Sequence, residues 1–280
     1  CKDKVAKISL YAPEAKEPTS IEAMLEKGSE LWLLQAFREL DDAILRLRFF
    51  HRNHGLWQWS SYGDSALILD AEKALYDAAH PKAHWFIREL ALHIGRVFRR
   101  LDVSSRSMLC LIDEQSAFAG VLAELLFLSD RSYAKESSII TLSVLNRGLL
   151  PTWSGVSRLE TRFLGHQQKL AQVFEQCNAQ AMSVDRALEL ELLTFVLDHI
   201  DFDHEVRLFK EERMALSPDA LSAMEANLRF NGPETLATKI FGRLSAWQNW
   251  VFIRDNATGP TGALSSYGQE KRAVFDFERC

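Results

Sequence analysis

Apolar and polar positions follow two different periods along the chain, and the period changes repeatedly before about residue 196. Short apolar or alternating runs predict strands, whereas longer stretches with apolar residues at every third or fourth position predict amphipathic helices. Strands are expected at residues 5–11, 56–60, 108–112, 131–134, 138–143 and 192–196. Helices are expected at residues 20–47 with a break near Gly28, and at 72–78, 81–100, 119–129, 156–163, 167–176 and 184–190.

The pattern becomes helical throughout from about residue 203. Amphipathic segments at residues 204–216, 218–230 and 234–254 are separated by Ser217-Pro218 and by Asn231-Gly232-Pro233, and residues 255–280 read as an extended tail. Strands that alternate with helices are typical of a layered α/β domain. We therefore expect an α/β core over residues 1–200, followed by a helical C-terminal region and tail over residues 201–280.

One stretch, residues 106–130, carries the most informative pattern. A short apolar strand at 108–112 ends in polar residues, and a helix begins near Ala119 with Gly120 in its first turn. The first N–H groups of a helix have no intrahelical partners and carry a partial positive charge, so they stabilise a carbonyl oxygen that gains negative charge. Glu124 follows about one turn later, where a carboxylate acts beside that oxygen. The alternative is a plain strand–helix unit in which Glu124 is a solvated charge.

Composition restricts the partners. With 47% hydrophobic and 25% charged residues the chain is ordinary globular protein, and a net charge of −5 gives no reason to expect nucleic acid. No run approaches the roughly 18 apolar residues of a membrane span, and no signal peptide is visible. We expect neither nucleic acid nor membrane as a partner.

The four cysteines, Cys1, Cys110, Cys177 and Cys280, show no paired spacing. This favours a reducing cytoplasm over a disulfide framework, and argues against a structural zinc site. Cys110 lies in an apolar strand, where we expect an inert buried thiol. Because the first residue is cysteine, we expect the chain to be a piece of something longer.

Metal and nucleotide chemistry are poorly supported. The pairs His51 and His54, and His80 and His84, lack the further ligands and the HExxH glutamate of a zinc site, so no metal is expected. The GxSxG, GxxxxGK[ST] and GxGxxG motifs are absent. The basic run at residues 96–100 suits the last turn of a helix, or alternatively a phosphate of a bound nucleotide-like cofactor.

The order of the elements resembles the crotonase (enoyl-CoA hydratase/isomerase) superfamily. The likeness rests on the strand and turn at residues 56–70, the strand–turn–helix at 107–130, and the loop and helix at 146–159. It implies a spiral of strand–strand–helix turns, an acyl-CoA substrate and no other cofactor. It also implies two backbone donors for the thioester oxygen, from Leu67 and from Val121 beside Gly120, with Glu124 as the first catalytic glutamate.

Longer motifs resemble one branch of that superfamily, the 2,3-epoxybenzoyl-CoA dihydrolases, or benzoyl-CoA-dihydrodiol lyases. They are Arg38-Glu-Leu-Asp-Asp-Ala-Ile-Leu, Leu101-Asp-Val-Ser-Ser-Arg-Ser, Phe118-Ala-Gly-Val-Leu-Ala-Glu-Leu, Ala226-Asn-Leu-Arg-Phe-Asn-Gly-Pro-Glu-Thr-Leu and Gly242-Arg-Leu-Ser-Ala-Trp-Gln-Asn-Trp. The likeness implies hydrolytic opening of an epoxide-bearing ring, with release of formate and without a metal. Members of this branch join two crotonase-like halves, and this chain resembles the C-terminal one.

Two departures from the pattern weaken the site. Counting back from Pro151, the second catalytic glutamate is replaced by Val144, and bulky residues at 67–69 replace the small ones around the first donor. Three interpretations follow: half of a dihydrolase, an inert half that completes a dimer or supports the N-terminal half, and a stand-alone acyl-CoA hydratase or isomerase that uses Glu124. The partners implied are acyl-CoA and either a second copy or the other half.

Overall fold

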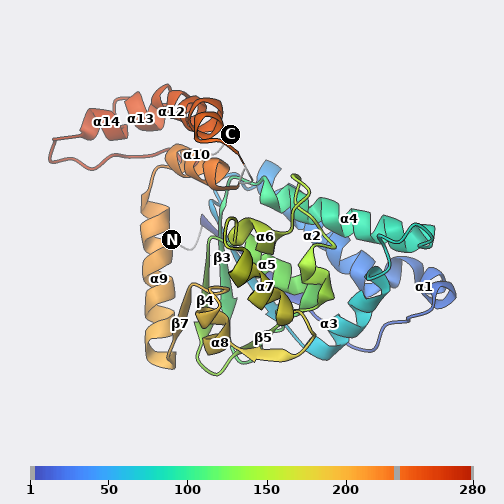
Figure 1. Cartoon of the computed structure of the whole chain (residues 1–280). Helices are drawn as coiled ribbons and strands as arrows, with labels where there is room; N and C mark the ends of the chain where they lie inside the picture. The colour runs from blue at the N-terminus through green and yellow to red at the C-terminus, as the bar shows by residue number, and fades with distance from the viewer. Residues whose placement is uncertain (1–3, 230–233, 279–280) are drawn as a thin grey trace.

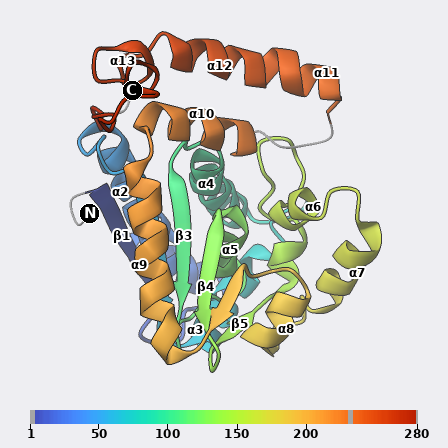
Figure 2. The same ribbon diagram turned by 90° about the vertical axis from the view of Figure 1, so that its left-hand side faces the viewer.

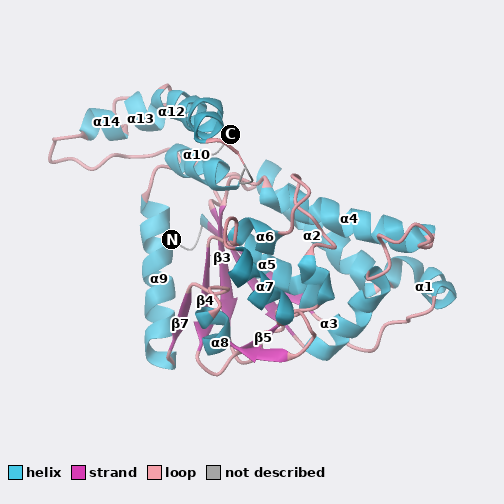
Figure 3. Ribbon diagram, viewed as in Figure 1, coloured by secondary structure: helices cyan, strands magenta, loops and turns pink. Residues whose placement is uncertain are grey.

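A parallel sheet of five strands forms the centre of the molecule (Figures 1 and 3). The computed structural model describes residues 4–229 and 234–278. The strand order is β1, β2, β3, β4, β7, with bounds Val5–Tyr11, Leu56–Tyr62, Ser107–Ile112, Arg131–Lys135 and Phe195–Leu197. Every neighbouring pair is parallel, as expected when helices or turns connect successive strands.

The two faces of this sheet are both covered, because alternate side chains of its central strands enter different cores. Trp57 and Trp59 of β2 join the larger core, whereas Leu56 joins a smaller one on the opposite face. Central strands of parallel sheets are buried on both faces and lack a clean polar alternation. This accounts for the nearly continuous burial of β2 and β3.

The larger core lies beneath two long helices, α2 (Trp32–Phe49) and α4 (Trp85–Asp102). The rings of Phe37 and Phe98 meet edge to face with their centroids 5.3 Å apart. The shorter helices α1 (Ile21–Lys27), α3 (Ser65–Glu72) and α5 (Glu124–Leu128) complete this layer. The site described below lies within it, where α3 meets the beginning of α5.

The opposite face is covered by α9 (His199–Ala215), which lies along the sheet in Figure 2. Its apolar side chains Phe202, Val206 and Phe209 contact the smaller core, which includes Tyr133 of β4. The predicted division of the chain after residue 200 stays a prediction. The structure adds that α9 lies against the sheet.

The remaining elements surround this centre. Beside β4 and β7 lie the antiparallel pair β5 (Ile139–Thr141) and β6 (Ala181–Ser183), with α6 (Arg158–Arg162), α7 (Gln167–Glu175) and α8 (Val184–Glu189). Beyond one end of the sheet lie α10 (Pro218–Arg229), α11 (Leu236–Lys239), α12 (Ser245–Phe252), α13 (Asp255–Thr258) and α14 (Ala263–Ser266) (Figures 1 and 2).

The α/β prediction is confirmed, and several boundaries are corrected by caps that the patterns did not reveal. Asp64 accepts the N–H of Ala66, so α3 begins at Ser65 rather than at residue 72. His84 accepts the N–H of Phe86, so α4 begins after His84 and not at Pro81. Asp198 caps α9 in the same way, which moves its start to His199.

Three further predictions near the C-terminus were inexact or untested. The strand expected at 192–196 lies at Phe195–Leu197, and β6 was not predicted because three residues show no period. The expected tail contains α13 and α14. The predicted break at Asn231-Gly232-Pro233, like Cys1 and Cys280, lies outside the described residues.

Replacing Phe209 tests the contact of α9 with the sheet. Its ring is 4% exposed and lies 5.9 Å from the ring of Tyr133. We expect Phe209→Ala to lower the free energy of unfolding by about 3–5 kcal/mol, because removing a large buried side chain leaves a cavity in the core. Urea unfolding measures it, with Ile200→Ala, at an 85% exposed position on the same helix, expected within about 0.5 kcal/mol of the unchanged protein. Equal losses for both variants would contradict the packing of α9.

Candidate functional site

The strand–turn–helix predicted from residues 106–130 is present. Strand β3 ends at Ile112, and a 3₁₀ turn, Gly120–Ala123, leads directly into α5. Gly120 has φ +47°, a conformation that favours glycine. The backbone N–H of Val121 is therefore presented at the start of this turn, where the sequence predicted a donor.

That N–H already has an acceptor from the chain itself. Val121 N donates a hydrogen bond of 2.5 Å to Oε2 of Glu72, the last residue of α3. A side chain at position 120 would clash with the same carboxylate, which gives a second reason for glycine there. The sequence predicted a free donor at Val121, and the structure places a carboxylate against it.

Glu72 is fully buried and lies among hydrogen-bond donors. The Tyr76 hydroxyl donates to Oε1 over 2.9 Å, one helical turn further along. Burial raises the pKa of Glu72 to about 7, although the hydrogen bonds from Ser143, Tyr76 and the Val121 N–H oppose the shift. The nearby Glu124 raises it further. Glu72 therefore titrates near neutral pH in the folded protein.

Glu124, the predicted catalytic carboxylate, is buried with both oxygens occupied. Asn146 Nδ2 donates to Oε1 over 2.8 Å, and Arg158 Nη1 donates to Oε2 over 2.9 Å. Arg158 also makes a two-pronged ion pair with Asp102, with bonds of 3.0 and 2.7 Å. Burial raises the pKa of Glu124, and Arg158 opposes that shift. The arrangement has the geometry of a buried ion-pair network.

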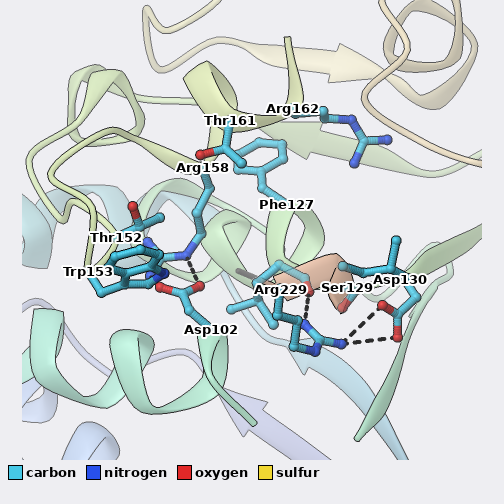
Figure 4. A pocket seen from close by; sticks show the side chains of 12 residues that line it. Asp102, Phe127, Ser129, Asp130, Thr152, Trp153, Arg158, Thr161, Arg162 and Arg229 are labelled. Atoms are coloured by element: carbon cyan, nitrogen blue, oxygen red, sulfur yellow. Dashed lines mark hydrogen bonds and ion pairs between the residues drawn. The ribbon is translucent and has the colours of Figure 1, made fainter. Parts of the chain in front are cut away.

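Figure 4 shows the Asp102–Arg158 pair in the wall of a pocket of about 220 Å³. A second pair, Arg229 with Asp130, lies in the same wall. Each of these two arginines is thus matched by an aspartate within hydrogen-bond distance. Arg162 also lines the pocket and donates to the carbonyl oxygen of Glu191. The wall therefore holds two charge pairs and a third arginine, and Trp153 lies at the side of the pocket.

The other predicted site residues are brought near Gly120 to different degrees. Helix α3, which carries Leu67, lies against the turn at Gly120, but the side chain that reaches Val121 is Glu72. Val144 is 53% exposed, and two residues later the buried Asn146 bonds to Glu124. Position 144, where the resemblance predicts a second glutamate, is thus an exposed valine, which has no group that transfers a proton.

The sequence analysis missed two residues at the Val121 donor, Glu72 and Tyr76. It also missed two residues of the ion-pair network around Glu124, Asp102 and Arg158. The i, i+4 spacing of Glu72 and Tyr76 was a usable signal for a helical pair. Asp102 and Arg158 lie 56 positions apart, a separation that no local pattern can reveal. Their contact depends on the packing of α4 against the segment that carries α6.

The placement of the described side chains does not support the metal site or the nucleotide-phosphate site considered from the sequence. Among residues 4–229 and 234–278, no group of three or more His, Cys, Asp or Glu side chains is arranged to hold a metal. Arg99 and Arg100 lie in the last turn of α4, as predicted, and Arg100 lies 2.7 Å from Asp41. None of the described helices combines the length and the apolar character that crossing a bilayer requires.

Comparison with solved structures decides the fold. An enoyl-CoA hydratase from Geobacillus kaustophilus HTA426 superposes with a TM-score of 0.66 at 15% identity, covering 98% of this chain and 94% of the hydratase. An enoyl-CoA hydratase from Bacillus anthracis gives 0.66 at 15% identity, covering 98% and 96%. The chain has the crotonase fold. This confirms the fold expected from the order of its elements.

Sequence comparison gives a closer relative of this crotonase-fold chain. It is 46% identical over 272 residues to benzoyl-CoA-dihydrodiol lyase from Aromatoleum evansii. The match covers 96% of this chain and 48% of the lyase, so the chain spans about half of that relative. No family model matches. The predicted resemblance to a half is confirmed, and its being the C-terminal half stays a prediction.

The raised pKa of Glu72 predicts a pH-dependent stability. When the pKa of a carboxyl rises from 4.5 to about 7 on folding, the folded protein binds its proton more tightly than the unfolded chain. The free energy of unfolding therefore falls as the pH increases from 4.5 to 7. Relative to Glu72→Gln, the unchanged protein should therefore lose about 3 kcal/mol between pH 4.5 and pH 7, with little change above. Urea unfolding at several pH values measures the difference.

Groups that titrate alike in the unchanged protein and in Glu72→Gln contribute equally to both free energies of unfolding, so their contributions cancel in the difference. Glu225, whose pKa burial also raises to about 7, is present in both. Glu189→Gln, which removes an exposed carboxylate paired with Arg186, is the control. A difference between Glu72→Gln and the unchanged protein that does not depend on pH would contradict a buried, titrating Glu72.

Removing Arg158 should be costly, because Asp102 and Glu124 would remain buried without a cation. We expect Arg158→Met to lower the free energy of unfolding by about 3–5 kcal/mol near neutral pH. Arg186→Met, which breaks an exposed pair with Glu189, should cost under about 1 kcal/mol. Both losses are measured as shifts of the urea midpoint, provided that the m-value does not change. A similar small loss for the two variants would show that the Arg158 network is solvated.

Proposed function

We propose that the chain is one half of a benzoyl-CoA-dihydrodiol lyase, and that the complete protein opens the ring of 2,3-epoxybenzoyl-CoA with release of formate. The observation that carries the proposal is the 46% identity to such a lyase, which extends over 96% of this chain. Identity at this level along nearly the whole chain supports a common reaction more strongly than the fold does, since one fold serves many reactions.

Within that protein, this half supports the reaction without performing it. Hydrolytic ring opening needs one group that activates water and another that protonates the departing oxygen. Glu124 has Asn146 and Arg158 on its two oxygens, and Val144 transfers no proton. The acid and base of the reaction therefore belong to the other half, and this half contributes its surface and its rigidity.

The alternative of a stand-alone hydratase or isomerase receives less support from the geometry. A catalytic acid or base must reach the substrate proton directly or through one water. Glu124 is 3% exposed and paired with a buried arginine. We infer the remaining partners from the same reasoning: acyl-CoA bound by the complete protein, with the other half or a second copy of this chain beside it.

A cytoplasmic location belongs to the same proposal. The two described cysteines, Cys110 and Cys177, are free and buried, which suits a reducing compartment. Burial raises the pKa of the Cys110 thiol to about 12, so it stays protonated and unreactive. Neither thiol is available as a nucleophile for the reaction.

An assay of formate released from 2,3-epoxybenzoyl-CoA tests the proposal. The 280-residue chain should release none, and the full-length two-half protein should release formate. Loss of a positioned acid or base typically costs ~100- to 10,000-fold, which is enough to remove detectable turnover.

The matched variant is Glu124→Gln in the two-half protein, checked for folding by circular dichroism. Because we propose that Glu124 stabilises the fold and transfers no proton, a folded variant should keep the kcat of the parent within about threefold. Formate release by the short chain, abolished by Glu124→Gln, would make Glu124 catalytic and overturn the proposal.

A further inference from the structure

Two donors bond to the buried carboxylate of Glu72, and a third hydroxyl group lowers its pKa. The donors are the backbone N–H of Val121 on Oε2 and the hydroxyl of Tyr76 on Oε1, and the third group is the hydroxyl of Ser143. They come from three parts of the chain: α3 and its continuation, the start of α5, and the loop after β5. Ser143 is itself fully buried. The carboxylate is thus held as a ligand would be.

The Val121 donor is the one that would hold a substrate oxygen. Backbone N–H groups aimed at an oxygen stabilise it as negative charge develops, and they do so most strongly where water is excluded. The 2.5 Å bond to Glu72 uses this N–H completely. Gly120 adds to the fit, because any side chain there would clash with the Glu72 carboxylate.

We propose that Glu72 is an internal competitor of the thioester oxygen, which excludes CoA thioesters from this half and directs them to the other one. The existence of a second half rests on the proposed function, whereas the closure of this half can be tested on the chain alone. Glu72 thereby acts as a specificity-determining residue, through the backbone donor that it occupies.

The competition favours Glu72 for two physical reasons. Its carboxylate is part of the chain, so it acts at the high effective concentration of a tethered group. A thioester oxygen that displaced it would leave a buried carboxylate without its strongest donor, and unsatisfied buried polar groups are costly. Among the described residues none forms an ion pair with Glu72, so the displaced group would gain no compensating cation there.

Nuclear magnetic resonance on the ¹⁵N-labelled chain tests the exclusion directly. The Val121 amide proton of the unchanged protein should lie far downfield and shift with pH near neutrality, and Glu72→Gln should abolish this shift. Adding benzoyl-CoA to 1 mM should leave the Val121 resonance of the unchanged protein in place. Saturable movement of this resonance with benzoyl-CoA would overturn the proposal.

A rescue experiment tests whether the donors form a carboxylate cradle. Glu72→Ala removes the CH₂–COO⁻ group, and acetate restores it from solution. We expect acetate to raise the Tm of Glu72→Ala with the logarithm of its concentration above the dissociation constant, by ~3 °C at ten times that constant. Acetamide, which has only one oxygen to accept from the two donors, should have at most a third of this effect.

The unchanged protein and Glu72→Gln are the controls, and acetate should not stabilise either one. Equal stabilisation of all three proteins by acetate would reject the cradle. If Glu72→Ala does not fold, the Val121 resonance of the unchanged protein with benzoyl-CoA decides the proposal. A two-half protein without formate release would reject the proposed function and would leave these results on Glu72 as they stand.

Discussion

The buried guanidinium of Arg158 is the interaction on which the surroundings of Gly120 depend. It bonds to Asp102 at the end of α4, to Glu124 at the start of α5 and to the Leu150 carbonyl oxygen. A buried charge is tolerated only with well-aligned partners, so these elements cannot shift independently. The position of α5, and with it the N–H of Val121, is therefore set by a charge network.

The placement of charges in this region gives its two glutamates different partners. Arg158 stays charged, because its two carboxylate partners hold its pKa above the usual value despite burial. It pairs with Glu124, whereas Glu72 has only neutral donors and the repulsion of Glu124. Burial raises the pKa of both carboxyls, that of Glu72 to about 7. Two carboxylates that flank one turn thus have separate roles, set by their distance from a single arginine.

The sequence predicted the parts of this structure that local patterns determine. The strands predicted at residues 5–11, 56–60 and 108–112 lie within one or two residues of their observed bounds, and so does the helix predicted to begin near Ala119. The site depends on contacts between distant positions: Glu72 with Val121, 49 residues apart, and Arg158 with Glu124, 34 apart. Periodicity cannot reveal such pairs, because it reports neighbours within about one turn or one strand pair.

Gly120 illustrates how a correct local prediction permits two opposite interpretations. A glycine that leaves room above a backbone N–H suits a substrate oxygen, and it suits a carboxylate of the same chain equally well. Here the room is filled by Glu72, as the clash at position 120 and the bond to Val121 require. In this chain, the residue at the end of α3 therefore decides whether the donor is available. The glycine and the glutamate at position 124 leave that question open.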